Sequence, residues 1–331
     1  MERSERMRQW LAPQFPGRRL DLAPASADAS FRRYFRLRLE DGATWIVMDA
    51  PPEHEDCRPF VRVAGLMEQA GLHVPHVAAQ DMDAGFLLLE DLGARTYLEA
   101  LDAGSADTLF DDAIEALLRW QLATRPGVLP PYDEPLLRRE LELFPDWYVA
   151  RHLGVELGAA QRGVLDETFA LLVARALAQP QVFVHRDYMP RNLMVSQPNP
   201  GVLDFQDAVL GPVTYDVVSL FRDAFLSWDE ERVLEWTIRY WERAKRAGLP
   251  VEQDFGRFYR DFEWMGLQRH LKVLGIFARI NYRDGKPHYL ADTPRFVGYV
   301  RKVAGRYREF GPLLQLFDEL EIRPVQAGAA S

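Results

Sequence analysis

The sequence has little of what marks a secreted, membrane or nucleic-acid-binding protein. Its single cysteine, Cys57, cannot form a disulfide within the chain, which fits a reducing compartment. No stretch reaches the roughly 18 consecutive apolar residues of a membrane span, and the charged residues 1–6 lead into no signal-like apolar run. The 49 acidic side chains outnumber the 40 basic ones, which argues against a general binder of nucleic-acid phosphates. We therefore expect a cytoplasmic protein with no nucleic-acid or membrane partner.

The length and the apolar pattern predict two lobes. At 331 residues the chain is about twice the usual length of one domain. Apolar residues alternate over 34–39, and an apolar run resumes at 45–48 after an Asp-Gly turn, which predicts a β-hairpin. Further elements are predicted as a helix over 57–71 and strands at 77–80 and 85–89. We place the lobe boundary after these strands, with a β-rich lobe at 1–91.

The rest of the chain, residues 92–331, has the apolar spacing of helices, and the two lobes together predict an α+β fold. Helices are expected over 165–177 and over about 255–280. Ser227 and Glu230 have the spacing of a capping box, which predicts that a helix begins there. Between these helices, short apolar strands at 182–184, 193–195 and 201–203 carry polar loops, and such loops often hold chemistry.

The strongest chemical signal is the pattern H-R-D-x-x-x-x-N at residues 185–192, directly after an apolar strand. Four fixed residue types at this spacing occur by chance on the order of 0.002 times in a chain of this length. A second carboxylate, Asp204, ends another apolar strand twelve residues after Asn192. Together these residues predict phosphoryl transfer.

Phosphoryl transfer needs an aligned hydroxyl and neutralisation of the nucleotide's charge. Asp187 is expected to accept the hydrogen bond of the attacking hydroxyl. Asn192 and Asp204 offer the hard oxygen ligands that Mg²⁺ prefers while it bridges the phosphates of ATP. The alternative is that Asp187 and Asn192 only cap turns. It is less favoured because the second carboxylate lies at the right distance, on the right kind of strand end.

Through these residues the chain resembles the aminoglycoside-phosphotransferase-like branch of the protein-kinase fold. The resemblance extends from the hairpin near Ser30 to the helices near Phe296. It implies a nucleotide-binding N-terminal lobe, a helical lobe with the catalytic loop and acceptor site, and ATP between the two. It also implies that Asp216, in the segment 211–216, orders the catalytic loop. In the family the hinge backbone binds adenine, and this hinge falls on Glu90, Asp91 and Leu92.

The chain departs from the kinase pattern at the phosphates. The first turn, residues 28–33, lacks the usual glycines, and Met48 stands where the third strand usually supplies a lysine. The nearest basic candidates are Arg32 and Arg33, and Ser30 offers a hydroxyl and a backbone N–H. The alternative for these arginines is an exposed turn. Without the lysine we assign no ion-pair role to Glu68.

A small-molecule acceptor is favoured because only about eight residues separate Phe205 from Val213, with no A-P-E element for a peptide. At a finer level the chain resembles bacterial anomeric sugar kinases of cell-wall recycling. This resemblance implies ATP-dependent phosphorylation of the C1 hydroxyl of N-acetylmuramate or N-acetylglucosamine. The choice of sugar and the anomer formed are left open. The matching strings lie at 28–36, 47–52, 185–192 and 266–273.

The lactyl carboxylate of N-acetylmuramate predicts positive charge in the sugar site. The predicted sugar contacts are one acidic, two aromatic and three basic side chains: Glu140, Trp147, Tyr148, Arg269, His270 and Lys272. For the basic residues a solvated helix face is the alternative, and for the aromatic residues it is a place in the core.

We thus expect a monomeric enzyme that uses ATP and Mg²⁺ on a small amino sugar. An aminoglycoside or other small-alcohol kinase is an alternative with the same chemistry, although polycationic antibiotics call for an acidic pocket and the distinctive helix here is basic. A kinase-like protein that binds without catalysis is a second alternative, since the lysine and the glycines are missing. Intact Asp187, Asn192 and Asp204 argue against it.

Overall fold

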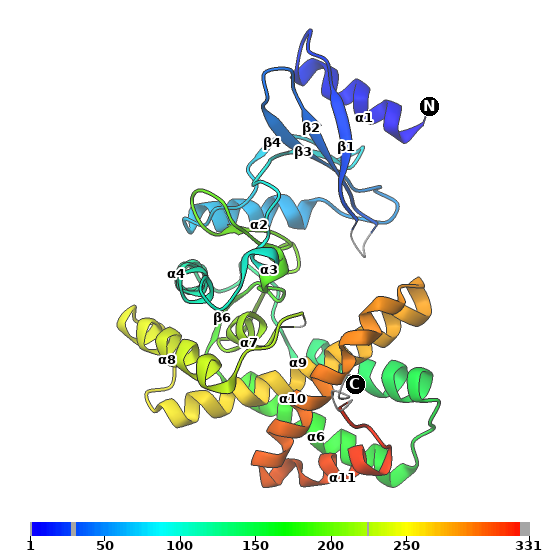
Figure 1. Cartoon of the computed structure of the whole chain (residues 1–331), viewed down its shortest axis with the longest axis vertical. Helices are drawn as coiled ribbons and strands as arrows, with labels where there is room; N and C mark the ends of the chain where they lie inside the picture. The colour runs from blue at the N-terminus through cyan, green and yellow to red at the C-terminus, as the bar shows by residue number, and fades with distance from the viewer. Residues whose placement is uncertain (1, 28–30, 224, 325–331) are drawn as a thin grey trace, which may run out of the picture. The chain divides into compact units, whose positions relative to one another are not determined.

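The computed structural model describes residues 2–27, 31–223 and 225–324. The chain forms two compact units, coloured along the sequence in Figure 1. Unit 1 consists of Met1–Trp120 and Pro190–Ala208, and unit 2 of Gln121–Met189 and Val209–Ser331. Residues 190–208 thus belong with the N-terminal part of the chain. The predicted boundary after residue 91 divides the chain into a nucleotide-binding lobe and a helical lobe. This division stays a prediction.

Unit 1 is built on a five-stranded antiparallel sheet in the order β1-β2-β3-β5-β4. The predicted hairpin is confirmed, with Tyr34 opposite Met48 and Leu37 opposite Trp45. The two strands predicted to follow it are also present. The strands are β1 (Asp21–Ala27), β2 (Arg33–Arg38), β3 (Thr44–Asp49), β4 (Val77–Asp81) and β5 (Phe86–Glu90).

One face of this sheet is covered by the N-terminal helix α1 (Arg3–Leu11), which lies beside the strands in Figure 1. Met7 and Leu11 of α1 pack with buried strand residues such as Leu37, Val47 and Phe86. Neither α1 nor β1 was predicted from the sequence. The edge strand β1 contains Pro24, which a central strand would exclude because proline cannot donate to the ladder.

Gly85 fixes the turn between β4 and β5. Its φ is +72°, and a Cβ at this position would lie 1.9 Å from the carbonyl oxygen of Ala50. Only glycine fits such a left-handed and crowded position. The other elements of unit 1 are η1 (Ala12–Gln14), α2 (Arg58–Gln69), α3 (Tyr97–Ala100), most of α4 (Ala106–Leu122), η3 (Pro190–Asn192), β7 (Leu193–Met194) and β8 (Gly201–Val202).

Unit 2 is mostly helical and is organised around α9 (Phe255–Asp284), the longest of the described helices. The predicted helix over 255–280 is therefore confirmed. Helix α9 contacts α5, α6, α7, α8 and α10. The remaining elements are α5 (Glu134–Leu141), η2 (Phe144–Leu153), α6 (Ala159–Ala178), β6 (Gln181–Val184), β9 (Val209–Pro212), α7 (Tyr215–Phe221), α8 (Glu230–Arg246), η4 (Pro287–Asp292), α10 (Thr293–Arg306), η5 (Arg308–Phe310) and α11 (Gly311–Glu319).

Gly275 lets α9 approach the π-helical segment η2 closely. A Cβ at Gly275 would lie 2.3 Å from the carbonyl group of Leu143, so the backbones could not stay at this distance. The β-rich unit 1 sheet and the helical remainder confirm the predicted α+β class.

The predicted capping box at Ser227 is wrong. The N-cap of helix α8 is Asp229 and not Ser227, and the Asp229 side chain makes no capping hydrogen bond. The Ser227 hydroxyl instead shares a hydrogen bond of 3.1 Å with the Tyr299 hydroxyl.

Across the described residues, no helix is both long enough and apolar enough to cross a bilayer.

Candidate active site

The H-R-D loop follows β6 in unit 2 and is held by its main chain. The buried carboxylate of Asp216, on α7, accepts hydrogen bonds from the backbone N–H groups of His185 (2.7 Å) and Arg186 (3.0 Å). Within the loop, the N–H of Asp187 donates to Nδ1 of His185 (3.2 Å). The expected role of Asp216 in ordering this loop is therefore consistent with its contacts.

Burial raises the pKa of Asp216 to about 7, even though the two N–H donors and Arg269 lower it; the charge of Asp187 adds to the rise. A buried carboxylate that accepts hydrogen bonds from amides, without a direct ion pair, is expected to have a raised pKa.

The side chain of Arg186 is fixed as well. The φ angle of Arg186 is +77°, a left-handed conformation that is rare for a residue with a Cβ. Its guanidinium donates to Oε1 of Glu140 at 2.5 Å. Three described residues other than glycine have positive φ, and two of them are Arg186 and Asp204, at the predicted site. Such strain concentrates at functional sites.

The predicted metal ligands lie together in unit 1. Nδ2 of Asn192 is 3.4 Å from Oδ2 of Asp204, and the N–H of Leu203 donates to the carbonyl of Asn192 (2.9 Å). Gln206 extends this group, because its Nε2 donates to Oδ1 of Asp204 (2.9 Å). Asp187 belongs to unit 2 and lies five residues before Asn192 in the chain.

This group fits Mg²⁺. It offers a carboxylate and amide oxygens, and Oε1 of Gln206 is a buried acceptor with no hydrogen-bond partner among the described residues. Mg²⁺ is usually bound by one or two carboxylates together with substrate phosphates. The part of the chain that the structure describes has no cluster of three His, Cys, Asp or Glu side chains that would form a complete metal cage. Gln206 was not predicted as a site residue from the sequence, although it follows Asp204 by only two positions.

The two candidate arginines for the phosphates differ in their surroundings. Nε of Arg32 is 3.3 Å from Glu55, and its side chain is 13% exposed. Burial lowers the pKa of Arg32, but Tyr34, Glu55, Asp204 and Asp207 outweigh burial and raise it. Arg32 therefore lies within the electrostatic reach of Asp204. Glu55 was not singled out from the sequence.

Arg33 is 55% exposed and pairs with Asp49 at 2.5 Å, and the same carboxylate also binds Arg3 of α1 at 2.6 Å. Arg33 thus ties β2 to β3. Met48, at the position of the missing lysine, is fully buried in the sheet. Ser30 lies outside the described residues.

The predicted hinge follows β5. Asp91 is tied to Arg36 by two hydrogen bonds of 2.7 and 3.0 Å, and Glu90 lies 3.5 Å from Nε2 of His73. The side chain of Leu92 is buried. The side chains of this segment are thus engaged within unit 1, and the predicted adenine contact concerns its backbone.

The predicted sugar contacts lie in unit 2, and most are buried. Glu140 and Lys272 form an ion pair with a distance of 2.9 Å. His270 is buried and stacks on Tyr299, and burial holds the pKa of His270 well below its usual value. Tyr148 stacks on Phe144 with ring centroids 5.7 Å apart.

Two of the predicted sugar contacts keep some capacity to bind. Arg269 is buried, and its Nη1 has no hydrogen-bond partner among the described residues. Trp147 is half-buried.

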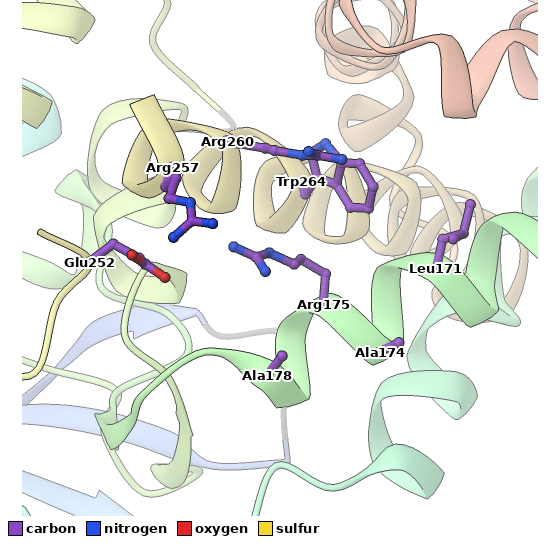
Figure 2. Close-up of a pocket in the computed structure, with 8 residues that line it drawn as sticks. All are labelled: Leu171, Ala174, Arg175, Ala178, Glu252, Arg257, Arg260 and Trp264. Carbon is purple, nitrogen blue, oxygen red and sulfur yellow. The ribbon is translucent and has the colours of Figure 1, made fainter. Parts of the chain in front are cut away.

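A groove of about 450 Å³ lies between α6 and the first half of α9 (Figure 2). Arg175, Arg257 and Arg260 line it, together with Glu252. Arg175 pairs with Asp261 and Arg260 with Glu309, so the carboxylates around the groove balance its arginines. None of the predicted site residues lines this groove.

The chain belongs to the phosphotransferase enzyme family, whose sequence model matches residues 21–255. This confirms the family resemblance. A solved structure of an ADP-bound aminoglycoside phosphotransferase matches with a TM-score of 0.59 and 13% identity, over 90% of this chain and 98% of the other. A choline/ethanolamine kinase family protein from Mesorhizobium loti matches with a TM-score of 0.60 and 15% identity, over 95% and 99%. At these identities the similarity concerns the fold, which is the predicted kinase-like one.

Much closer relatives carry one name. The N-acetylmuramate/N-acetylglucosamine kinase of Pseudomonas aeruginosa is 58% identical over 300 residues, which cover 91% of this chain and 88% of that protein. The protein of the same name from Neisseria meningitidis serogroup B is 50% identical over 324 residues, covering 97% and 96%.

Proposed function

We propose that this protein is an ATP-dependent kinase that phosphorylates the C1 hydroxyl of N-acetylmuramate and N-acetylglucosamine in peptidoglycan recycling. The observation that carries this proposal is the identity of half or more of the aligned residues to two relatives named for these sugars, over nearly the whole chain. In the reaction the C1 oxygen forms a bond to the γ-phosphorus. The bond from that phosphorus to the bridging oxygen breaks, and its electron pair leaves with ADP. The products are the sugar 1-phosphate and ADP.

Asp187 is the proposed base. It accepts the hydrogen bond of the C1 hydroxyl and takes up the proton as the new bond forms. An anomeric hydroxyl is more acidic than an ordinary alcohol, so a carboxylate suffices when the transition state is loose. The two backbone N–H bonds to Asp216 support this role because they fix the loop on which Asp187 lies.

Asn192 and Asp204 are the proposed Mg²⁺ ligands, and Gln206 is added to them on the strength of its unpartnered buried oxygen. When bound, the ion neutralises charge on the phosphates of ATP. The residues of this chain contribute the oxygen ligands and hold them together through the hydrogen bonds between Asp204 and its two amide neighbours.

Arg32 is the proposed phosphate-binding cation that replaces the missing lysine. Both arginines pair with a carboxylate, but Arg32 also interacts electrostatically with Asp204, a proposed Mg²⁺ ligand, which favours it over Arg33. A guanidinium has five N–H donors and can bind phosphate oxygens while paired with a carboxylate. The backbone of Glu90, Asp91 and Leu92 is proposed to bind adenine, and a contact from Ser30 stays a prediction.

For the sugar we propose contacts from Arg269, His270, Trp147 and Tyr148. The Nη1 donor of Arg269 supports a contact with an acceptor-rich ligand, since it has no partner in the described part of the fold. Glu140 and Lys272 are left out of this group because they neutralise each other. We further propose that the protein is cytoplasmic, acts as a monomer and has no nucleic-acid partner.

The experiment is phosphorus NMR of the purified protein with ATP, Mg²⁺ and one acceptor at a time. N-acetylmuramate and N-acetylglucosamine are each expected to give a sugar 1-phosphate signal coupled to the C1 proton, and omission of Mg²⁺ should suppress it. An aminoglycoside such as kanamycin serves as the matched amino-sugar control. A phosphate ester formed only on the antibiotic, or ATP left intact with both sugars, contradicts the proposal.

A further inference from the structure

In unit 2, three charged and largely buried side chains, one of them from the H-R-D loop, form a cluster. We call Glu140, Arg186 and Lys272 the buried charge cluster. Their side chains are 7%, 19% and 9% exposed, respectively. They come from α5, the loop after β6, and α9, so three segments far apart in the sequence meet at one carboxylate.

Glu140 is the centre of this cluster. Its Oε1 accepts from Arg186 at 2.5 Å and lies 2.9 Å from Nζ of Lys272, and its Oε2 accepts from the hydroxyl of Tyr132. Lys272 also donates to the hydroxyl of Tyr215 at 3.0 Å. Both carboxylate oxygens are thus engaged within the fold, which leaves Glu140 poorly suited to bind a sugar hydroxyl.

The cluster is ionised. Burial alone raises the pKa of Glu140, but Lys272 and Arg186 outweigh burial and, with Tyr132, lower it to about 2. Burial lowers the pKa of Lys272, yet Glu140 raises it overall. Burial lowers the pKa of both cations, and the negative charge of Asp187 is one of the groups that raise it. The extra positive charge of the cluster therefore interacts electrostatically with the proposed base.

Arg186 links the cluster to Asp187. Its left-handed backbone costs conformational energy, so the surrounding contacts must hold it in place. Asp216 holds its N–H and Glu140 holds its guanidinium. A rotation of Arg186 out of this conformation would redirect Asp187, the next residue along the chain.

We infer that Glu140 and Lys272 are positioning residues for phosphoryl transfer. They act through Arg186 to fix the orientation of Asp187 and do not contact the sugar. Only the kinetic test of this inference rests on the proposed function.

The first test compares Glu140→Gln with Glu134→Gln. Glu134 lies on the same helix but forms an exposed pair with Arg138, which makes it a matched control. With Glu140→Gln we expect kcat to fall by about 100-fold, the cost of a small misplacement of a catalytic group. The KM values for both sugars should stay unchanged, and Glu134→Gln should behave like the wild type. A raised sugar KM with unchanged kcat, or wild-type kinetics, overturns the inference.

A second readout does not depend on activity. Hydrogen exchange of the peptide covering 181–189 should be faster in Glu140→Gln than in the wild type or in Glu134→Gln. Equal exchange in all three proteins contradicts the positioning role. If the wild type phosphorylates neither sugar, the proposed function fails, and this comparison decides the positioning role by itself.

Lys272→Met covers the case in which Glu140→Gln does not fold, because it keeps the pair between Glu140 and Arg186. We expect a smaller fall in kcat that is the same for both sugars. A rise in KM for N-acetylmuramate alone would mean that Lys272 binds the lactyl carboxylate, and the inference would be wrong.

Discussion

The H-R-D loop in unit 2 and the group around Asp204 in unit 1 are built in different ways. Two buried carboxylates hold the loop. Asp216 accepts hydrogen bonds from its backbone N–H groups, and Glu140 accepts one from the side chain of Arg186. The group around Asp204 is linked by hydrogen bonds between its own members, and it leaves a buried oxygen of Gln206 without a partner among the described residues. A base needs one fixed direction, whereas residues that receive an ion and phosphates need polar atoms that the fold has not used.

The largest effect is expected where the anchored side is broken. Asp216→Ala leaves the buried N–H of His185 and the partly buried N–H of Arg186 without an acceptor, and each such group costs about 1–3 kcal/mol. We therefore expect the free energy of unfolding to fall by about 2–6 kcal/mol in urea denaturation. Asp216→Asn, which keeps one acceptor oxygen, should lose less. Equal stability of the alanine variant and the wild type would mean that Asp216 does not anchor the loop.

The next effect separates the two arginines on the nucleotide side. Arg32→Ala should weaken ATP binding by about 10- to 100-fold, the equivalent of about 1.5–3 kcal/mol for a hydrogen bond to a charged group. Arg33→Ala should leave the Kd for ATP unchanged and lower stability only slightly, because Arg33 is half-exposed and binds Asp49. Titration calorimetry with ATP compares them. The reverse ranking would identify Arg33 as the phosphate-binding cation.

A smaller effect tests whether Gln206 binds Mg²⁺ through Oε1, the buried oxygen that has no hydrogen-bond partner among the described residues. Gln206→Leu should raise the Mg²⁺ concentration for half-maximal activity by about 10-fold, as for the loss of a residue that supports metal binding. The control is Gln161→Leu in unit 2, 31 residues before Asn192 in the chain, whose side chain forms exposed hydrogen bonds with Gly158 and Glu319. An unchanged Mg²⁺ requirement would remove Gln206 from the metal site.

The smallest effect is the pH dependence of the protein's stability, which has opposite signs for Asp216 and Glu140. The pKa of Asp216 is raised to about 7 by burial, so the stability from its protonated form is complete below about pH 4 and is lost as the pH rises through 7. The pKa of Glu140 is lowered to about 2 despite burial, because Lys272 and Arg186 are near. Its contribution is present above about pH 4.5 and is lost as the pH falls through 2.

Urea denaturation of the wild type and of Asp216→Asn at pH 5 and pH 8 checks this sign. The stability advantage of the wild type over the variant should shrink at pH 8. An advantage that grows with pH would contradict the raised pKa.

Local patterns predicted most of the elements that surround the site. Alternation gave the hairpin of β2 and β3, and helical spacing gave α9. The H-R-D pattern and Asp204 marked the two loops on which the proposed base and metal ligands lie. These features depend on residues close together in the chain.

Features that depend on distant residues could not be predicted. Glu140 is 46 residues from Arg186 in the sequence, and nothing local shows that the two side chains meet. For the same reason the sequence did not indicate that Glu140 pairs with Lys272. The capping-box pattern at Ser227 failed because tertiary contact with Tyr299 engages the serine hydroxyl.

The central claim is that Asp187 serves the transfer of phosphate to the sugar C1 hydroxyl. The most direct measurement is the initial rate of sugar 1-phosphate formation by Asp187→Asn, together with its Kd for ATP. We predict a rate about 10²- to 10⁴-fold below that of the wild type, the usual contribution of a general base, with ATP affinity unchanged. A variant that turns over at the wild-type rate would contradict the account.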